Sequence, residues 1–115
     1  MQRRYRLRES KNFLRLRQDG RVYHHQQMLL SLLPNGLSYN RYGVIATKNL
    51  GKAVVRNRVR RLTGEAVRLL HPRLRAGFDI VLVPRSGLIG QSFVTVSDVV
   101  TELCCQAGIL VEYEP

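Results

Sequence analysis

The longest helical pattern in the chain runs from Ala53 to Leu70. Apolar residues recur there at spacings of 4, 3, 4 and 3 positions, at Val55, Val59, Leu62, Ala66 and Leu69. This period is typical of an amphipathic helix with one face against a core. At about 100° per residue, the opposite arc holds one asparagine and four arginines: Asn57, Arg56, Arg60, Arg61 and Arg68. We therefore predict a helix over 53–70 with an apolar face and a cationic face.

Shorter patterns in the first third of the chain predict one helix, one or two strands and a turn. A helix over 11–18 is expected to be capped by Ser10 and ended by a left-handed Gly20. The stretch 22–33 begins polar and ends apolar, which fits either one strand with a bulge or two short strands in sequence. Pro34, Asn35 and Gly36 then predict a turn.

The remaining patterns complete a mixed fold. The alternation over 41–47 predicts a strand that pairs with 28–33, and the apolar run 78–83 predicts a strand buried on both faces. Residues 95–98 resemble a capping box, after which helical spacing continues to Gly108. The order helix, strands, helix, strand, helix indicates an α+β fold, a two-layer α/β sandwich.

Length and composition favour one small domain. The chain has 115 residues, 44% of them hydrophobic, which predicts a single domain over 1–115 with a basic leader over 1–9. No apolar run approaches the ~20 residues that span a bilayer, so no membrane partner is expected. The leader lacks the apolar segment of a secretory signal. Cys104 and Cys105 are adjacent, which suits a reduced, cytoplasmic protein.

The charge is concentrated in the first half of the chain. Residues 1–61 contain 15 basic and 2 acidic side chains, a formal +13, whereas residues 62–115 contain 4 basic and 6 acidic ones, a formal −2. Such a concentration repels itself and favours a polyanionic partner, above all a nucleic acid. Arginine outnumbers lysine 16 to 3, which suits phosphate binding, although a compositional bias of the genome would produce the same excess.

Self-sufficient catalysis is not predicted, and we assign no catalytic or metal-binding residue. The sequence offers neither a nucleophile with an oriented base nor a set of metal ligands at suitable spacing. His24 and His25 would point to opposite faces of a strand. Asp79 is an isolated acid, and Glu65 lies among arginines where an ion pair is expected.

The predicted basic helix and its approach loop contain a long motif, Lys48-Asn-Leu-Gly-Lys-Ala-Val-Val-Arg-Asn-Arg-Val-Arg-Arg-Leu62, centred on Arg56-Asn57-Arg58. This run closely resembles the signature of the bacterial ribonuclease P protein subunit. The resemblance extends to the basic leader and to the segments 10–13, 41–48 and 78–85. It implies the order α-β-β-β-α-β-α, with two strands in 22–33. It also implies a left-handed β-α-β crossover, as in ribosomal protein S5 domain 2-like folds, against the usual right-handed preference.

The resemblance also implies a function. The family's protein subunit joins a catalytic RNA, with one protein expected per RNA. The complex removes the 5′ leader from precursor tRNA by Mg²⁺-dependent hydrolysis of a phosphodiester bond. The RNA component, rather than protein side chains, would hold the catalytic Mg²⁺ ions.

Two sets of site residues follow from the resemblance. Contacts with the catalytic RNA are expected through charge-assisted bonds to phosphates from Lys48, Lys52, Arg56, Asn57, Arg58, Arg60, Arg61 and Arg68. Arg58 lies at the edge of the apolar stripe, so a role in covering the core is equally open. A cleft beside the first helix is expected to bind the single-stranded leader through Phe13, Arg17, Ser31 and Arg85.

The chain departs from the family pattern at both expected surfaces. Arg17 and Ser31 stand where further aromatic residues commonly line the cleft, and Gly64 stands where the basic helix often has another arginine. Phe13 as an ordinary core residue also remains open.

Three other functions are compatible with a small basic domain. A ribosomal or RNA-chaperone protein would bind RNA without stimulating precursor cleavage. A DNA-binding domain is disfavoured because the predicted helix lacks mixed base-reading side chains. A nuclease that acts alone would cleave without any RNA subunit.

Overall fold

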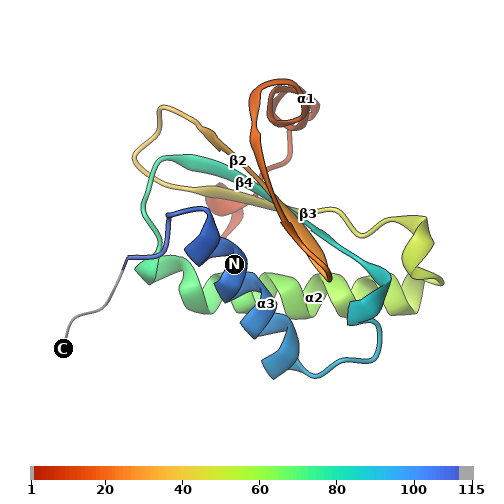
Figure 1. The fold of residues 1–115 in the computed structure, drawn as a ribbon. Coiled ribbons are helices and arrows are strands. Elements are labelled where there is room, and N and C mark those ends of the chain that lie inside the picture. Colours follow the sequence, from red (N-terminus) through yellow and green to blue (C-terminus); the bar gives the residue numbers. More distant parts are fainter. Residues whose placement is uncertain (1, 112–115) are drawn as a thin grey trace.

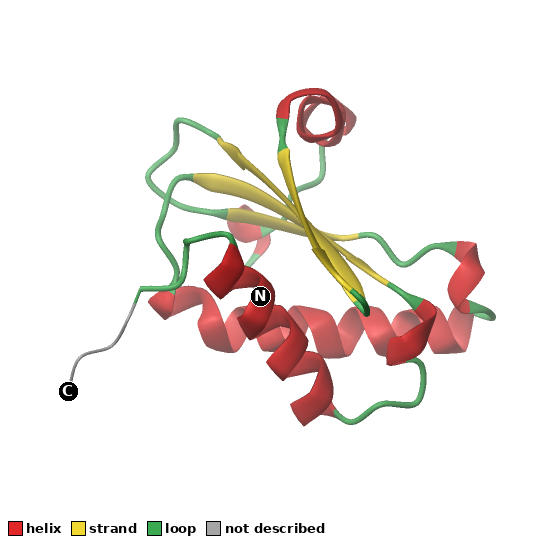
Figure 2. Cartoon of the chain, in the orientation of Figure 1, coloured by secondary structure: helices red, strands yellow, loops and turns green. Residues whose placement is uncertain are grey.

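The computed structural model describes residues 2–111 and has the element order expected for an α-β-β-β-α-β-α protein (Figures 1 and 2). Its helices and strands are α1 (Ser10–Asp19), β1 (Arg21–His25), β2 (Met28–Pro34), β3 (Arg41–Val44), α2 (Ala53–Leu70), β4 (Phe78–Pro84) and α3 (Phe93–Gln106). The predicted α+β class is confirmed. The ends of the predicted domain, residue 1 and residues 112–115, lie outside the described residues.

The four strands form one sheet in the order β1-β2-β4-β3. β1 and β2 form an antiparallel hairpin, so the two-strand alternative for 22–33 is the correct one. β3 is parallel to β4, with Gly43 opposite Val81, and α2 makes the crossover between them. The predicted pairing of 41–47 with 28–33 is therefore wrong. β4, which is apolar on both faces, lies between these strands because the central position buries it most completely.

Helices lie on both faces of the sheet, but they cover the two faces unequally. α2 and α3 lie together on one face, while α1 lies across the other (Figure 1). The α2/α3 side contains the main core, with fully buried side chains at Met28, Leu30, Ile80, Leu82, Val100 and Leu103. The α1 side contains only a small cluster around Leu16 and Val81. Part of that second sheet face is therefore open.

The buried stripe of α2 differs from the predicted apolar stripe. Its buried residues are Val59, Thr63, Ala66, Val67 and Leu70, whereas Leu69 is 52% exposed. At ~100° per residue this is a rotation of roughly 60° about the helix axis. Thr63 tolerates burial because its hydroxyl donates to the Val59 carbonyl oxygen at 2.8 Å. The rotation turns one side of the cationic arc toward the core.

Three predicted helix ends are wrong. α1 begins at Ser10 itself, after Glu9, and Gly20 has φ −72°, which is not left-handed. Glycine is required there because a Cβ would collide with the Leu16 carbonyl oxygen. α3 begins before the predicted capping box, at a cap where the Ser92 hydroxyl accepts from the Thr95 N–H at 3.3 Å.

The other predicted helix ends agree with the structure. α2 spans 53–70 as predicted, and Gly108 after α3 has the left-handed φ of 75°. Among residues 2–111, no helix is long and apolar enough to cross a membrane.

Candidate RNA interface

The exposed side of α2 and its approach loop present most of the predicted RNA contacts to solvent. Lys48, Lys52, Asn57, Arg60, Arg61 and Arg68 are all exposed. The Arg60 guanidinium donates to Asn57 Oδ1 at 2.9 Å, which orders both side chains on one face. We call this set the cationic face of α2. Its donors can bind several phosphates at once because they project from one rigid helix and its approach loop.

The approach loop is anchored by a single apolar residue. Lys48–Leu50 form a short 3-10 turn, and Leu50, only 3% exposed, packs with Ala46 and Val59. Gly51 follows with φ 111°, a conformation that other residues rarely adopt. This geometry leaves Lys48 and Lys52 exposed on either side of a buried anchor.

Arg56 differs from the prediction that it projects from the solvent face. It is half-buried, and its Nε is the only buried side-chain nitrogen or oxygen without a hydrogen-bond partner among residues 2–111. The rotation of α2 toward the core explains this position. An unpaired buried donor costs free energy.

Arg58 connects two helices. It is half-buried, and its guanidinium donates to the Gln91 carbonyl oxygen at 3.1 Å, in the loop before α3. Of the two roles left open by the sequence, this contact favours the one in which Arg58 orients α2.

Arg68 pairs with Glu65 one turn earlier on the helix. Its Nη2 and Nε donate to the two carboxylate oxygens at 2.6 and 3.0 Å, and the hydrogen bond from Arg68 lowers the pKa of Glu65. The predicted ion pair of Glu65 is confirmed. Between these residues and Arg60, Gly64 leaves a gap in the cationic face, since no atom lies within 4 Å of a Cβ built there.

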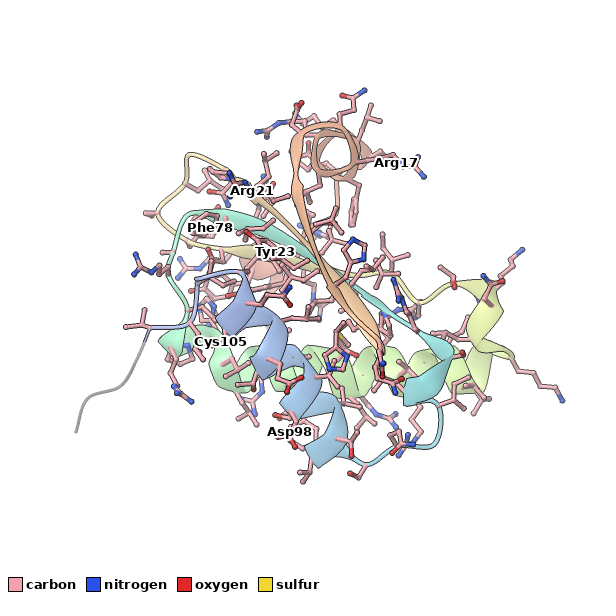
Figure 3. The ribbon with its side chains drawn as sticks, viewed as in Figure 1. Arg17, Arg21, Tyr23, Phe78, Asp98 and Cys105 are labelled. Carbon is pink, nitrogen blue, oxygen red and sulfur yellow. The ribbon has the colours of Figure 1, made fainter. Side chains whose placement is uncertain are left out.

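A second surface is the cleft between α1 and the open part of the sheet. It has a volume of about 910 Å³, and its lining includes Phe13, Arg17 and Ser31, three of the four residues predicted for a leader site. Arg17 projects from α1 (Figure 3). Arg85 is not among the lining residues; it is exposed beyond the end of β4, where its backbone N–H donates to the Gln27 carbonyl oxygen at 2.9 Å. The placement of Arg85 in the cleft is therefore wrong.

Phe13 packs on backbone as well as lining the cleft. A Cβ on Gly43 would lie 3.0 Å from two carbons of the Phe13 ring, so the ring rests directly against β3. Phe13 is half-buried and adjoins the small cluster around Leu16. The core role and the cleft role are thus compatible in one side chain.

The cleft also contains apolar residues that the sequence did not identify. Leu14, Val22 and Ile45 line it with exposed fractions of 50%, 47% and 40%. In the sequence these residues show only the alternation of a strand or the spacing of a helix. Neither pattern distinguishes a residue on a partly covered sheet face from a core residue. The cleft is therefore mainly aliphatic, with cations at Lys11 and Arg17 and hydroxyls at Ser10 and Ser31.

One cation of the first half is neutralised inside the fold. Arg41 and Asp79 form a bidentate pair with two N–O distances of 2.8 Å, and Asn35 Nδ2 donates to the same carboxylate at 3.1 Å. Asp79 is 1% exposed. The apparently isolated acid is thus a structural partner, and Arg41 does not contribute a free cation to an RNA surface.

The remaining titratable residues do not assemble a metal centre within residues 2–111, which contain no group of three or more His, Cys, Asp or Glu placed to hold an ion. His25 bonds Glu102 at 2.8 Å on the α3 side, while His24 is exposed and alternates to the other face. Cys104 is buried, and burial raises its pKa to about 12, whereas Cys105 is exposed.

Known proteins match the chain over nearly its full length. The family model described as Ribonuclease P matches residues 1–108. The ribonuclease P protein component of Roseiflexus castenholzii is 40% identical over 111 residues, covering 96% of this chain and 91% of the relative. That of Chloroflexus aurantiacus is 41% identical over 111 residues, covering 96% and 82%. The chain belongs to the ribonuclease P protein family.

Solved structures of the ribonuclease P protein family have the same fold. The RNase P protein from Thermotoga maritima superimposes with a TM-score of 0.81 at 30% identity, covering 88% of this chain and 96% of that one. A mutant RNase P protein from Staphylococcus aureus reaches a TM-score of 0.87 at 20% identity, which demonstrates the shared fold. Family membership identifies the chain as a tRNA-processing, RNA-binding subunit of an endoribonuclease, whose partner is the ribonuclease P RNA.

Proposed function

We propose that the protein binds the ribonuclease P RNA through the cationic face of α2 and the 5′ leader of precursor tRNA through the cleft beside α1. The observation that supports this division is the position of the family signature. Its exposed cations lie on one face of α2 and on the approach loop before it, whereas the cleft lies on the opposite side of the sheet. One protein could therefore contact two RNAs at once.

The cationic face suits a folded RNA because it contributes many donors without reading bases. Arg60, Arg61, Lys48 and Lys52 are exposed, and cations of this kind gain affinity by releasing counterions from phosphates. The formal +13 charge of residues 1–61 also raises the rate at which the protein associates with RNA. In this proposal Arg56 and Arg58 help to hold the helix in place, and their guanidinium groups add phosphate contacts at its edge.

The cleft suits a single strand because its floor is apolar and its polar groups are few. Phe13 offers a ring for base stacking, Arg17 a cation for a phosphate, and Ser31 a hydroxyl for hydrogen bonding. Aliphatic neighbours such as Ile45 would contact bases without distinguishing them. The proposed leader contact is therefore tolerant of sequence.

Catalysis is assigned to the RNA component. Mg²⁺ bound by that RNA would activate the water that hydrolyses the phosphodiester bond. We assign no Mg²⁺ ligand to this chain. The protein's contribution is to bind and align the substrate. We place it in the cytoplasm, with one protein per RNA.

The test is cleavage of a precursor tRNA at low Mg²⁺ by a bacterial ribonuclease P RNA, with and without the protein, beside the protein alone. We expect stimulation only when both components are present. Tight RNA binding without stimulation would indicate the ribosomal or RNA-chaperone alternative. Cleavage by the protein alone would indicate a self-sufficient nuclease, and light scattering of the complex would measure its stoichiometry.

A further inference from the structure

The N-terminal segment packs against the far end of α2. The backbone of Arg6 bridges to Tyr42 in β3, and the Leu7 N–H donates to the Tyr42 carbonyl oxygen at 2.7 Å. The short turn Arg3–Tyr5 (red in Figure 1) is thereby placed beside the end of α2. A hollow of about 460 Å³ lies between them, and we call it the N-terminal hollow; it is lined by Gln2, Tyr5, Arg68 and His71.

A chain of hydrogen bonds connects Asn40, Tyr42 and His71. The Asn40 amide oxygen accepts from the Phe78 N–H at 2.8 Å, so its nitrogen is a donor, and it donates to the Tyr42 hydroxyl at 3.1 Å. That hydroxyl can then donate its own proton to His71 Nδ1, 2.7 Å away. Burial raises the pKa of Tyr42 to about 12, which keeps its proton in place. With the hydroxyl as the donor, we assign the proton of the neutral His71 ring to Nε2.

The Nε2–H of His71 is available to a ligand. It has no hydrogen-bond partner among residues 2–111. It is also accessible to solvent, because Arg56 Nε is the only unpaired side-chain nitrogen or oxygen that is buried there. Burial, followed by the nearby charge of Arg4, lowers the pKa of His71 and favours the neutral ring. The hollow is thus lined by His71 and by the Arg68 guanidinium, whose Nε and Nη2 are paired with Glu65 and whose Nη1 has no hydrogen-bond partner among residues 2–111.

An aromatic surface adjoins these donors. The Tyr5 ring lies 4.5 Å from the His71 ring, between centroids, at an interplanar angle of 49°. The Arg4 guanidinium lies 4.7 Å from the centroid of Tyr5, and the Tyr39 ring meets Tyr5 edge-on at 5.9 Å. Tyr5 is half-buried, so part of it stays accessible. A base that stacks on this ring would therefore take the place of the exposed Arg4 guanidinium.

We propose that the N-terminal hollow is an additional nucleotide-binding site, which receives a phosphate on Arg68 and His71 and an unpaired base on Tyr5. An imidazole, a guanidinium with one unpaired Nη1 and an aromatic ring together have the chemistry that recognises an unpaired ribonucleotide. This inference rests on the proposed function, because it takes the ligand to be RNA. The nucleotide belongs either to the ribonuclease P RNA or to the precursor tRNA.

The test uses two substitutions in the full chain that remove different parts of the site. Tyr5→Leu removes the ring but keeps apolar bulk, and His71→Phe keeps an aromatic ring but removes the Nε2–H. His25→Phe, at a half-buried histidine of the α3 side, is the matched control. Affinity is measured first for the ribonuclease P RNA alone and then, with assembled holoenzyme, for precursor tRNA.

We expect Tyr5→Leu to weaken one of these affinities about tenfold and His71→Phe to weaken the same one about threefold, with His25→Phe unchanged. The affinity that falls identifies the RNA that supplies the nucleotide. Unchanged affinities in folded variants, with the wild type still stimulating cleavage, would overturn this inference alone. A wild type that fails to stimulate cleavage would instead overturn the proposed function.

A crosslinking measurement keeps the inference testable if Tyr5→Leu fails to fold. A photoreactive p-azidophenylalanine at Tyr5 preserves the ring and should crosslink to RNA in the assembled complex. The same group at Tyr23, on β1, is the control and should not crosslink. Equal crosslinking at both positions, or none at Tyr5, would contradict a nucleotide in the N-terminal hollow.

Discussion

The cationic face of α2 and the cleft beside α1 are two RNA surfaces of opposite character in our proposal. The first is convex and charged, and a short continuous stretch of chain, 48–68, supplies it. The second is concave and mainly aliphatic, with lining residues from α1, three strands and the segment that follows β3. One surface is a local property of the sequence, and the other exists only after the sheet has formed.

This difference has a consequence for binding. Charges act over about 10 Å at 0.1 M salt and tolerate small errors of position, whereas stacking in a cleft requires contact. We therefore expect the cationic face to dominate affinity and its salt dependence. The cleft should instead decide which tRNA is preferred, because only a precursor has a leader to place there.

The largest expected effect comes from reversing charge on the cationic face. Arg60→Glu with Arg61→Glu should weaken binding of the ribonuclease P RNA about 100-fold, because two charge-assisted contacts worth ~1.5 kcal/mol each are lost. Filter binding across a salt series should also show that the slope of log K against log[salt] is smaller in magnitude by about 1.5. The fold should be unchanged, since both side chains are exposed.

A second pair of arginines provides the control for that experiment. Arg21→Glu with Arg75→Glu changes the net charge equally at exposed positions, at the start of β1 and in the segment between α2 and β4. An equal loss of affinity in this control would mean that total charge, and not the face of α2, governs binding.

The next effect concerns the cleft. Phe13→Ala should lower the preference of the holoenzyme for precursor over mature tRNA about tenfold, since stacking contributes ~1–3 kcal/mol per base. Phe13→Tyr keeps the ring and should retain the preference. The measurement is a pair of binding curves for the two tRNAs. If both tRNAs lose affinity equally, the ring on Gly43 serves packing rather than leader binding.

A smaller effect should follow from filling the gap in the cationic face. Gly64→Arg has open space around the new side chain, and we expect about threefold tighter RNA binding with a salt slope steeper by ~0.7–0.9. Gly64→Ala is the matched control, because it adds ~1 kcal/mol of helix propensity without charge. Tighter binding in both variants would trace the gain to helix stability instead.

The smallest effect concerns the end of α2, where the N-terminal segment meets it. Burial lowers the pKa of His71 from 6.5 in the folded protein. The unfolded chain therefore binds a proton at His71 more readily than the folded protein does. Stability contributed by neutral His71 is therefore present above pH 6.5 and is lost as pH falls below it. Thermal midpoints measured from about pH 7.5 to about pH 5 should fall less in His71→Phe than in wild type. An identical fall of the thermal midpoint in both proteins would show that protonation of His71 does not affect stability over this pH range.

Prediction from the sequence succeeded where one element could be judged alone. Helix 53–70 has its predicted bounds because its period is long and regular, and the buried strand 78–83 was evident from its apolar run. The Phe13, Arg17 and Ser31 side chains also meet in one cleft, as the family resemblance implied. Arg56 and Arg85 were misplaced, because their exposure and neighbours depend on elements far away in the chain.

By itself the sequence determined the element types, the family and the concentration of positive charge. Each of these depends on residue identity or on spacing within one segment. Tertiary structure decided which strands are neighbours, how far α2 turns about its axis, and that Arg41 is neutralised by a buried Asp79. It also created the cleft and the N-terminal hollow. These features require contacts between segments that are distant in the sequence. Several segments can cover the same core, and the pattern within one segment does not determine which of them does so.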